Sequence, residues 1–462
     1  MKTYQEFVST KIQAPAIYGN NPAPVHPMLF DFQEAITRWA IRRGRAAIFA
    51  DCGLGKTLCQ LEWARQSGER VLILAPLAVA EQTISEGRRI GLSVRKVDRP
   101  DAEPGIQITN YEKLSHFVAV PYDGIVLDES GILKSLDGKT RTMLLREFTG
   151  IPRRLCCTAT PAPNDLSELA NHAEFLGVMS RVEMLATFFV HDSDRSGSDG
   201  WRLKGHAQDA FWRWVAKWAT YVRMPSDLGF DDGEFRLPEL AITQELVRVD
   251  WKPEGMLFSA GLGGISDRRD ARRNTLDARV ARSAEIIGSS DEQWLVWCGL
   301  NAEGDGLEKA LGDDCEQIAG CDSDEEKIEK ERRWRAGEVR TLITKSSIFG
   351  WGMNWQHCRN MLFLGIGDSY EQYYQSIRRC WRFGQKRPVN AIIVVSDAEQ
   401  TVAENVRRKE KDAASLAEGI VAHAKDAMRA EVRDGERQQE TYNPTVRMKL
   451  PAWAKGSKEC AA

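Results

Sequence analysis

The sequence predicts an α/β protein made of two tandem lobes with parallel sheets, with a helical insertion and linker between them. Short apolar segments recur in both halves of the chain, and stretches with helical character separate most of them. Strands that alternate with helices are typical of parallel sheets covered on both faces. A length of 462 residues suits roughly two to four domains, and a hydrophobic content of 42% can fill more than one core.

Each half of the chain contains its own set of candidate strands. In the first half they are 46–50, 71–75, 106–109, 124–127 and 153–158. In the second half they are 293–298, 340–344, 361–364 and 391–395. Between the two sets, the segment 211–218 has helical spacing and three tryptophans. Packing in a core or between the lobes is favoured over base stacking for these aromatic side chains.

These patterns divide the chain into five regions. The expected regions are an N-terminal extension over 1–27, lobe one over 28–170, a helical insertion and linker over 171–285, lobe two over 286–420, and a C-terminal helix and tail over 421–462.

Composition excludes several classes of protein. No apolar run approaches the roughly 18 residues of a membrane-spanning helix, and the N-terminus lacks the apolar core of a signal peptide. The ten cysteines include no CxxC pair, and Cys156, Cys157 and Cys298 lie inside expected strands. We therefore expect no membrane association, no zinc or disulfides, and buried thiols in a reducing cytoplasm.

The charge pattern argues against a protein that coats nucleic acid indiscriminately, because the net charge is −3. It leaves room for a local basic groove. Arginines crowd two stretches, 268–282 and 378–387, with lysine also present in the second. A solvated helix face is an equally good interpretation of the first cluster.

A phosphate-binding loop follows the first candidate strand. Gly53 to Leu58 read Gly-Leu-Gly-Lys-Thr-Leu, directly after the apolar run 46–50 and before a helical stretch, 58–65. Backbone N–H groups of Gly53, Gly55 and the helix start would point at an anion, and Lys56 adds a point charge. Thr57 supplies a hydroxyl for Mg²⁺. The strict form of this loop has a glycine where this chain has Ala50.

A pair of carboxylates completes the phosphate site. The short apolar strand 124–127 ends in Asp128-Glu129. Two carboxylates at the tip of a buried strand are costly unless a positive group neutralises them, and Mg²⁺ bound to a triphosphate would do so. We expect Asp128 to hold the metal and Glu129 to polarise the attacking water.

Further segments occur in a recognisable order and spacing along the chain. They are Phe32-Gln33, Asp51–Thr57, Leu74–Leu77, Ile108–Glu112, Thr158–Asn164, Gly350–Asn354 and Gln375–Gln385. With these segments, the chain resembles a superfamily-two helicase, and more narrowly the Swi/Snf-type branch of ATP-dependent DNA translocases. The resemblance spans residues from about 28 to 388 and implies two RecA-like lobes with ATP in the cleft between them.

The resemblance also implies roles for residues of both lobes. Gln33 belongs to the adenine-reading segment, and Gly352 to a motif that completes the nucleotide site. Arg379 and Arg382, which stand with Gln375 in the last motif, would reach across the cleft and stabilise charge on the transferring phosphate. ATP would close the cleft and hydrolysis would reopen it, so that nucleic acid held by both lobes moves in steps.

The expected partner is DNA, held largely independently of its sequence, because the grip would come mainly from contacts to phosphates. The residues expected near these contacts are Pro76, Thr109, Thr344 and Asn354. The chain resembles compact bacterial or bacteriophage members more than large eukaryotic chromatin remodellers, which implies the cytoplasm of a bacterium or of a phage-infected host cell. Replication, recombination or repair proteins are expected as further partners.

The chain departs from the family pattern at one position of the carboxylate motif. Asp128-Glu129-Ser130-Gly131 has glycine where the family usually has a histidine that links the ATP site to the lobe interface. Two alternatives to a DNA translocase remain open at this point, an RNA helicase and an ATP-binding scaffold that changes shape and recruits partners. Thr160 to Asn164 favour DNA, and the presence of Lys56, Asp128, Glu129, Arg379 and Arg382 argues against an inactive ATPase.

Overall fold

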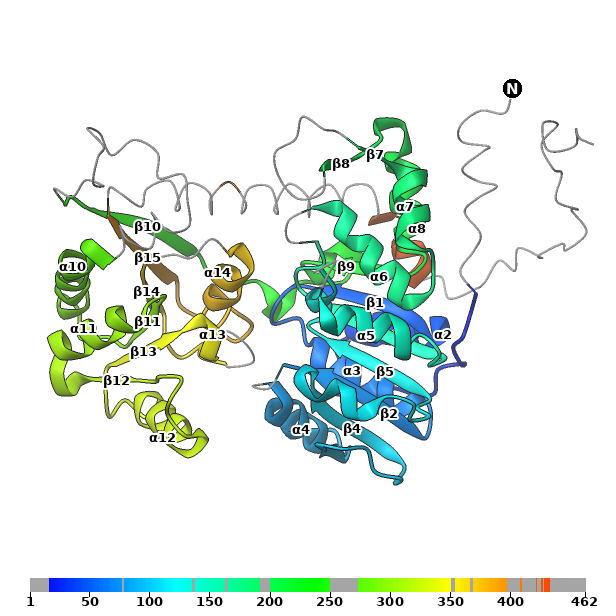
Figure 1. The fold of residues 1–462 in the computed structure, drawn as a ribbon, viewed down its shortest axis with the longest axis horizontal. Coiled ribbons are helices and arrows are strands. Elements are labelled where there is room, and N and C mark those ends of the chain that lie inside the picture. Colours follow the sequence, from blue (N-terminus) through cyan, green and yellow to red (C-terminus); the bar gives the residue numbers. More distant parts are fainter. Residues whose placement is uncertain are drawn as a thin grey trace, which may run out of the picture.

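The protein consists of two α/β lobes, each with a parallel sheet and covering helices, as the computed structural model shows (Figure 1). The structure describes residues 16–76, 79–134, 138–162, 165–191, 200–249, 273–349, 354–365 and 369–396, together with 408, 421, 425–426 and 428–432. The two tandem RecA-like lobes expected from the sequence are therefore confirmed. No helix in the described part of the chain is long and apolar enough to cross a membrane.

Lobe one is built on a seven-stranded sheet in the order β3-β4-β2-β5-β6-β1-β9, with every neighbouring pair parallel. Its strands are β1 (Arg45–Ala50), β2 (Arg70–Ala75), β3 (Val94–Lys96), β4 (Gly105–Asn110), β5 (Gly124–Asp128), β6 (Arg153–Thr158) and β9 (Ala219–Val222). Its helices are α2 (Asp31–Arg43), α3 (Lys56–Gln66), α4 (Ala80–Arg89), α5 (Lys139–Glu147), α6 (Leu169–Leu176), α7 (Arg181–Phe188) and α8 (Gln208–Ala216). A short antiparallel hairpin pairs β7 (Phe189–His191) with β8 (Trp201–Leu203).

Lobe two is built on a six-stranded parallel sheet in the order β10-β15-β14-β11-β13-β12. Its strands are β10 (Leu240–Val247), β11 (Trp294–Cys298), β12 (Cys315–Gln317), β13 (Thr341–Lys345), β14 (Asn360–Leu364) and β15 (Val389–Ser396). Its helices are α10 (Leu276–Gly288), α11 (Asn301–Leu311), α12 (Asp324–Arg335), α13 (Ser346–Phe349) and α14 (Tyr370–Ile377). Separate apolar clusters pack on this sheet.

The nine candidate strands all appear in the sheets, but the range 171–285 differs from the helical insertion that was expected. It contributes a strand to each sheet, β9 beside β1 and β10 beside β15. Neither strand has the long apolar run of a central parallel strand. β9 is only four residues long, and β10 is a half-exposed edge strand, so its side chains need not be uniformly apolar.

Three tryptophans of the 211–218 segment pack inside lobe one. Trp212, Trp214 and Trp218 are all buried, and the last two meet edge to face with ring centroids 5.4 Å apart. The preference for core packing over base stacking is therefore confirmed.

The chain returns to lobe one after lobe two. Met428 and Val432 belong to the apolar core of lobe one, and the Met428 sulfur accepts a hydrogen bond from the Tyr221 amide. Arg429 donates to the carbonyls of Ser226 and Asp227. The two lobes are thus linked by the segment between η8 (Gly233–Phe235) and β10, and again by the chain beyond β15.

The first arginine cluster contains a structural ion pair. Arg279 and Glu303 have fully buried side chains, with Nη1 and Oε1 3.0 Å apart. The other Glu303 oxygen accepts the amides of Gly299 and Leu300 at 2.8 and 2.9 Å, so this carboxylate also fixes the start of α11. Arg282 instead pairs with Glu245 and Glu285 on the surface.

We expect Glu303→Ala to lower the free energy of unfolding of lobe two by about 3–5 kcal/mol, because it removes the carboxylate that forms the buried ion pair with Arg279. Arg282→Ala is the matched control on the same helix, and its exposed pairs predict a much smaller loss. Chemical denaturation of the two variants measures the difference. Equal losses would contradict a structural role for the buried pair.

Candidate active site between the lobes

The phosphate loop connects β1 to α3 and depends on two glycines. Gly53 and Gly55 have φ angles of 87° and 75°, a left-handed backbone that other residues rarely adopt. A β-carbon at Gly55 would lie 2.3 Å from Gln33 Nε2, and one at Gly53 would lie 2.9 Å from the backbone nitrogen of Phe383 in lobe two. The loop is therefore shaped by backbone conformation and by close approach from both sides.

Lys56 is the first residue of α3, and its side chain extends back to the start of the loop. Its Nζ donates to the carbonyl oxygens of Ala50 at 2.9 Å and Asp51 at 3.4 Å. Burial works to lower the Lys56 pKa, but the acidic side chains around it, Cys52 and Glu129 first among them, outweigh burial and raise it. The lysine is therefore a fixed positive charge at the loop. Thr57 follows it, half-buried, in the first turn of α3.

Gln33 joins the first helix to the phosphate loop. Its buried amide accepts a hydrogen bond from the Phe30 backbone at 3.0 Å and donates to the Leu54 carbonyl at 2.9 Å. Both ends of the amide are thus engaged with protein in this structure. Next to it, Phe30 and Phe235 meet Phe383 of lobe two, with ring centroids 6.2 and 4.8 Å from that ring. Aromatic faces from both lobes therefore converge beside the loop.

Asp128 lies at the buried end of β5, 5% exposed, next to the phosphate loop. Its Oδ1 accepts hydrogen bonds from Gln60 Nε2 at 2.7 Å and from the Glu129 amide at 3.1 Å. Burial raises the pKa of Asp128, against the opposing effects of Gln60 and Lys56. A carboxylate held in this way would gain from a cation.

Glu129 stands beside Asp128 in an uncommon backbone conformation, with φ of 53°. Its Oε2 accepts from Thr158 Oγ1 at 3.2 Å, and the same hydroxyl accepts from the Thr160 amide at 3.2 Å. Burial raises the pKa of Glu129 to about 7, the Lys56 charge opposes this, and Asp128 adds to it. The Thr158–Ala159–Thr160 segment therefore positions the Glu129 carboxylate.

The site chemistry fits a magnesium nucleotide. Among the described residues, no group of three or more His, Cys, Asp or Glu could hold a metal ion by protein ligands alone. Magnesium commonly takes one or two carboxylates together with substrate phosphates and waters. Asp128 and the Thr57 hydroxyl suit that arrangement, because burial leaves the Asp128 carboxylate in need of positive charge.

Lobe two brings its arginines against this loop. Arg379 is 5% exposed, and it donates to the Gln375 carbonyl at 3.0 Å and to Gln375 Oε1 at 2.9 Å. Its charge acts on Glu129, whose pKa it lowers. A β-carbon on Gly53 would lie 3.7 Å from the Arg382 β-carbon. Burial lowers the pKa of Arg382 to about 10, and the nearby Arg379 charge adds to this.

The structure also shows contacts across the cleft that the sequence did not reveal. Asp51 forms an ion pair with Arg378 and accepts a hydrogen bond from the Tyr374 hydroxyl. The Cys52 thiol donates to Gln375 Oε1 at 3.6 Å. These partners are more than 300 positions apart in the chain, so no local pattern could pair them. The second basic cluster and the segment Gln375–Gln385 had pointed to this part of lobe two, but not to these partners.

The second ion pair between the lobes joins Lys134 to Glu371. Lys134 ends the short helical turn η3 (Ser130–Lys134) that follows Glu129, and Glu371 lies in the first turn of α14. Neither residue belongs to a motif that had been singled out.

The residues expected to contact nucleic acid are placed less favourably for side-chain contact. Thr109 and Thr344 are 3% and 1% exposed, and Thr344 Oγ1 donates to the Ile318 carbonyl at 3.3 Å. Pro76 and Asn354 are half-buried.

Thr344 and its neighbour Lys345 line a cavity of about 450 Å³ at the carboxyl ends of β11, β12 and β13. Gly352, and with it the expected contact to the nucleotide, lies outside the described residues.

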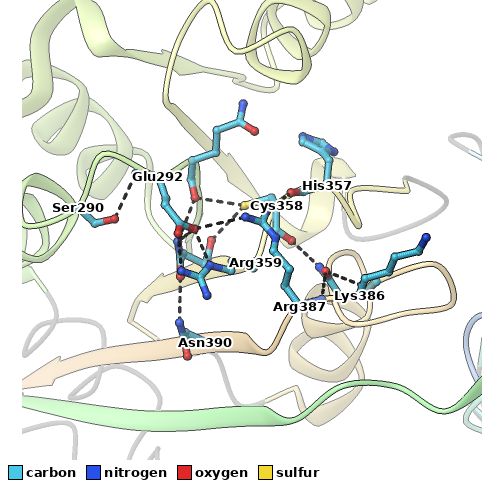
Figure 2. Close-up of polar contacts among 11 residues, drawn as sticks. Ser290, Glu292, His357, Cys358, Arg359, Lys386, Arg387 and Asn390 are labelled. Atoms are coloured by element: carbon cyan, nitrogen blue, oxygen red, sulfur yellow. Dashed lines mark hydrogen bonds and ion pairs between the residues drawn. The ribbon is translucent and has the colours of Figure 1, made fainter.

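The last residues of the second basic cluster have a structural role at the opposite end of the lobe-two strands. Gln385 Nε2 donates to the Cys358 carbonyl at 3.0 Å, and its Oε1 accepts the amides of Lys386 and Arg387 at 3.0 Å (Figure 2). Arg387 also donates to the His357 carbonyl at 2.8 Å. Figure 2 shows Glu292 facing Arg359 in the same network, where they form an ion pair. The closing Gly-Gln of the last motif therefore fixes a turn, while Arg378 and Arg382 before it lie next to the phosphate loop of lobe one.

Comparison with known families supports a helicase assignment for lobe two. Residues 280–384 match the helicase conserved C-terminal domain. The matched range begins within α10, ends at Gly384, and includes Gln375, Arg379 and Arg382. The comparison with curated proteins found no match. The matched domain supports membership of the helicase superfamily and a nucleic-acid helicase or translocase kind of function.

Proposed function

We propose that this protein is an ATP-dependent DNA translocase or helicase of the Swi/Snf-like branch, and that it couples ATP hydrolysis to movement along DNA. One observation carries the proposal. Arg382 of lobe two lies against Gly53 of the phosphate loop, and the buried Arg379 is near enough to Glu129 for its charge to lower the pKa of that carboxylate. An enzyme that only bound ATP in lobe one would not need these arginines from the second lobe, and the burial of Arg379 would be costly without a role for its charge.

Residues of both lobes would take part in phosphoryl transfer. Lys56 and the loop amides would bind the phosphates of ATP, and Glu129, held by Thr158, would orient the attacking water. Mg²⁺, when bound at Asp128 and Thr57, would supply positive charge to the phosphate oxygens. Arg379 and Arg382 would stabilise the charge that develops during transfer. Since these donors sit on different lobes, hydrolysis would depend on the position of lobe two.

The same arrangement would allow movement along a nucleic acid. ATP would favour the state in which both lobes contact it, and the hydrolysis products would not, so each cycle would close and reopen the cleft. The distance between the two sites at which the lobes contact the strand would then change in each cycle, and this change would move the strand. We propose DNA as that strand, and a bacterial or phage-infected cytoplasm with replication, recombination or repair proteins as the setting.

The test is the ATPase rate without nucleic acid and with single-stranded DNA, duplex DNA and RNA. We expect stimulation by DNA, and we expect DNA affinity to fall steeply with salt and to change little between unrelated sequences, because phosphates dominate the contacts. Greater stimulation by RNA would favour an RNA helicase. No stimulation by any nucleic acid, with ATP binding intact, would favour an ATP-dependent scaffold.

A further inference from the structure

Gly131 leaves a space at the interface of the lobes. It is buried two residues after Glu129, and its backbone is not in the left-handed region, so the conformation does not require glycine. A β-carbon there would lie 3.1 Å from Glu371 Oε1 of lobe two and 3.8 Å from Thr158 Oγ1. The first of these distances is tighter than an ordinary contact. A side chain at this position would therefore require the carboxylate of Glu371 to shift.

Glu371 is connected through α14 to the residues of lobe two that lie at the phosphate loop. It lies one helical turn before Gln375 on α14, so the two side chains share a face of the helix. Gln375 contacts Cys52 of the phosphate loop and also holds Arg379. A shift of Glu371 relative to lobe one would therefore move the group that positions the arginine.

Lys134 compensates the charge that Glu371 brings to the interface. The Glu371 side chain is 10% exposed, and its carboxylate forms an ion pair with Lys134, whose side chain is 37% exposed. A carboxylate this far buried is unfavourable without a partner. Glu129 lies near enough for the negative charge of Glu371 to raise its pKa. Separation of the lobes would break the ion pair.

We propose that the Lys134–Glu371 ion pair positions α14 against the carboxylate motif, in the space that Gly131 leaves, and makes hydrolysis depend on the position of lobe two. This inference rests on the proposed function. Lys134 and Glu371 are positioning residues, because they act through Gln375 and Arg379 rather than on the nucleotide. The pair would serve in this chain at the place where the family's histidine links the ATP site to the lobe interface.

The contact itself can be tested without any activity. Carbodiimide treatment of the full chain joins a lysine and a carboxylate that are in contact, and mass spectrometry identifies the joined peptides. We expect a Lys134–Glu371 cross-link, beside the Lys330–Asp322 cross-link inside lobe two, where Nζ and Oδ2 are 2.9 Å apart. Recovery of the control cross-link without the one between the lobes would overturn the proposal.

The functional role is tested by a double-mutant cycle on the DNA-stimulated ATPase. Lys134→Ala and Glu371→Ala are each expected to lower the stimulated kcat about tenfold with little change in the KM for ATP, and the double variant no further than either one. Lys330→Ala is the matched control and should keep the wild-type rate. Additive losses, or losses in KM alone, would contradict a shared positioning role.

Gly131→Ala adds a steric test. The new methyl group would displace Glu371, so it should lower the stimulated kcat in the wild-type background but have little further effect in the Glu371→Ala background. An equal effect in both backgrounds would contradict the role assigned to the space. Failure of wild type to respond to nucleic acid would defeat the proposed function, whereas a responsive wild type with additive variants would defeat only this inference.

Discussion

Glu129→Gln is expected to lower ATP hydrolysis by about a hundredfold or more while ATP still binds. The amide keeps the shape of the side chain but cannot accept a proton from the attacking water as a carboxylate can. Lys56→Ala should have the contrasting effect and weaken nucleotide binding, because it removes the cation of the phosphate loop. Steady-state ATPase rates and nucleotide affinities distinguish the two outcomes.

Glu81→Gln is the control for Glu129→Gln. Glu81 is an exposed glutamate of lobe one that pairs with Lys96 on the surface, so its neutralisation should leave the rate unchanged. Near-normal turnover by Glu129→Gln would show that another group orients the water.

Arg382→Ala should reduce DNA-stimulated hydrolysis on the order of a thousandfold, in the range measured for arginines that act on a transferring phosphate. The affinity for ATP should change only modestly, since lobe one can hold the nucleotide with Lys56 and the loop amides. Arg379→Ala should act in the same direction with a smaller effect. ATPase rates with and without saturating DNA, measured beside nucleotide affinity, provide the test.

Arg387→Ala is the matched control for the arginine variants. It removes an arginine five residues from Arg382 whose side chain is 52% exposed and belongs to the network around Glu292 and His357. Its ATPase should respond to DNA as wild type does. Full DNA stimulation in both Arg379→Ala and Arg382→Ala would mean that the second lobe does not complete the active site.

Local patterns in the sequence predicted the central strands well, because buried parallel strands are short and continuously apolar. They did not predict β10, a half-exposed edge strand with mixed side chains, or β12, which has three residues. The phosphate loop and carboxylate pair were also visible, since each follows a buried strand directly. Their surroundings were harder to foresee, because contacts such as Asp51 with Arg378 join residues from opposite lobes.

The contacts of individual site residues depend on tertiary packing, which the sequence does not reveal. Gln33 was expected in the adenine-reading segment, and the structure shows its amide between α2 and the phosphate loop. Thr344 was expected near nucleic acid, but its hydroxyl is engaged with the Ile318 carbonyl. Gly131 was recognised as a departure from the family pattern. Its closeness to Glu371 could not be predicted, because it depends on how the two lobes are placed.

The return of the chain to lobe one makes lobe two an insert within its neighbour. Lobe one contains residues on both sides of lobe two, from α2 at one end to Met428 and Val432 at the other. A domain tethered at both ends has fewer accessible positions when undocked than a domain on a single linker. It therefore loses less entropy when it docks. The two halves of the site therefore meet at a high effective concentration. The opening and closing proposed above would then keep the two lobes connected in every cycle.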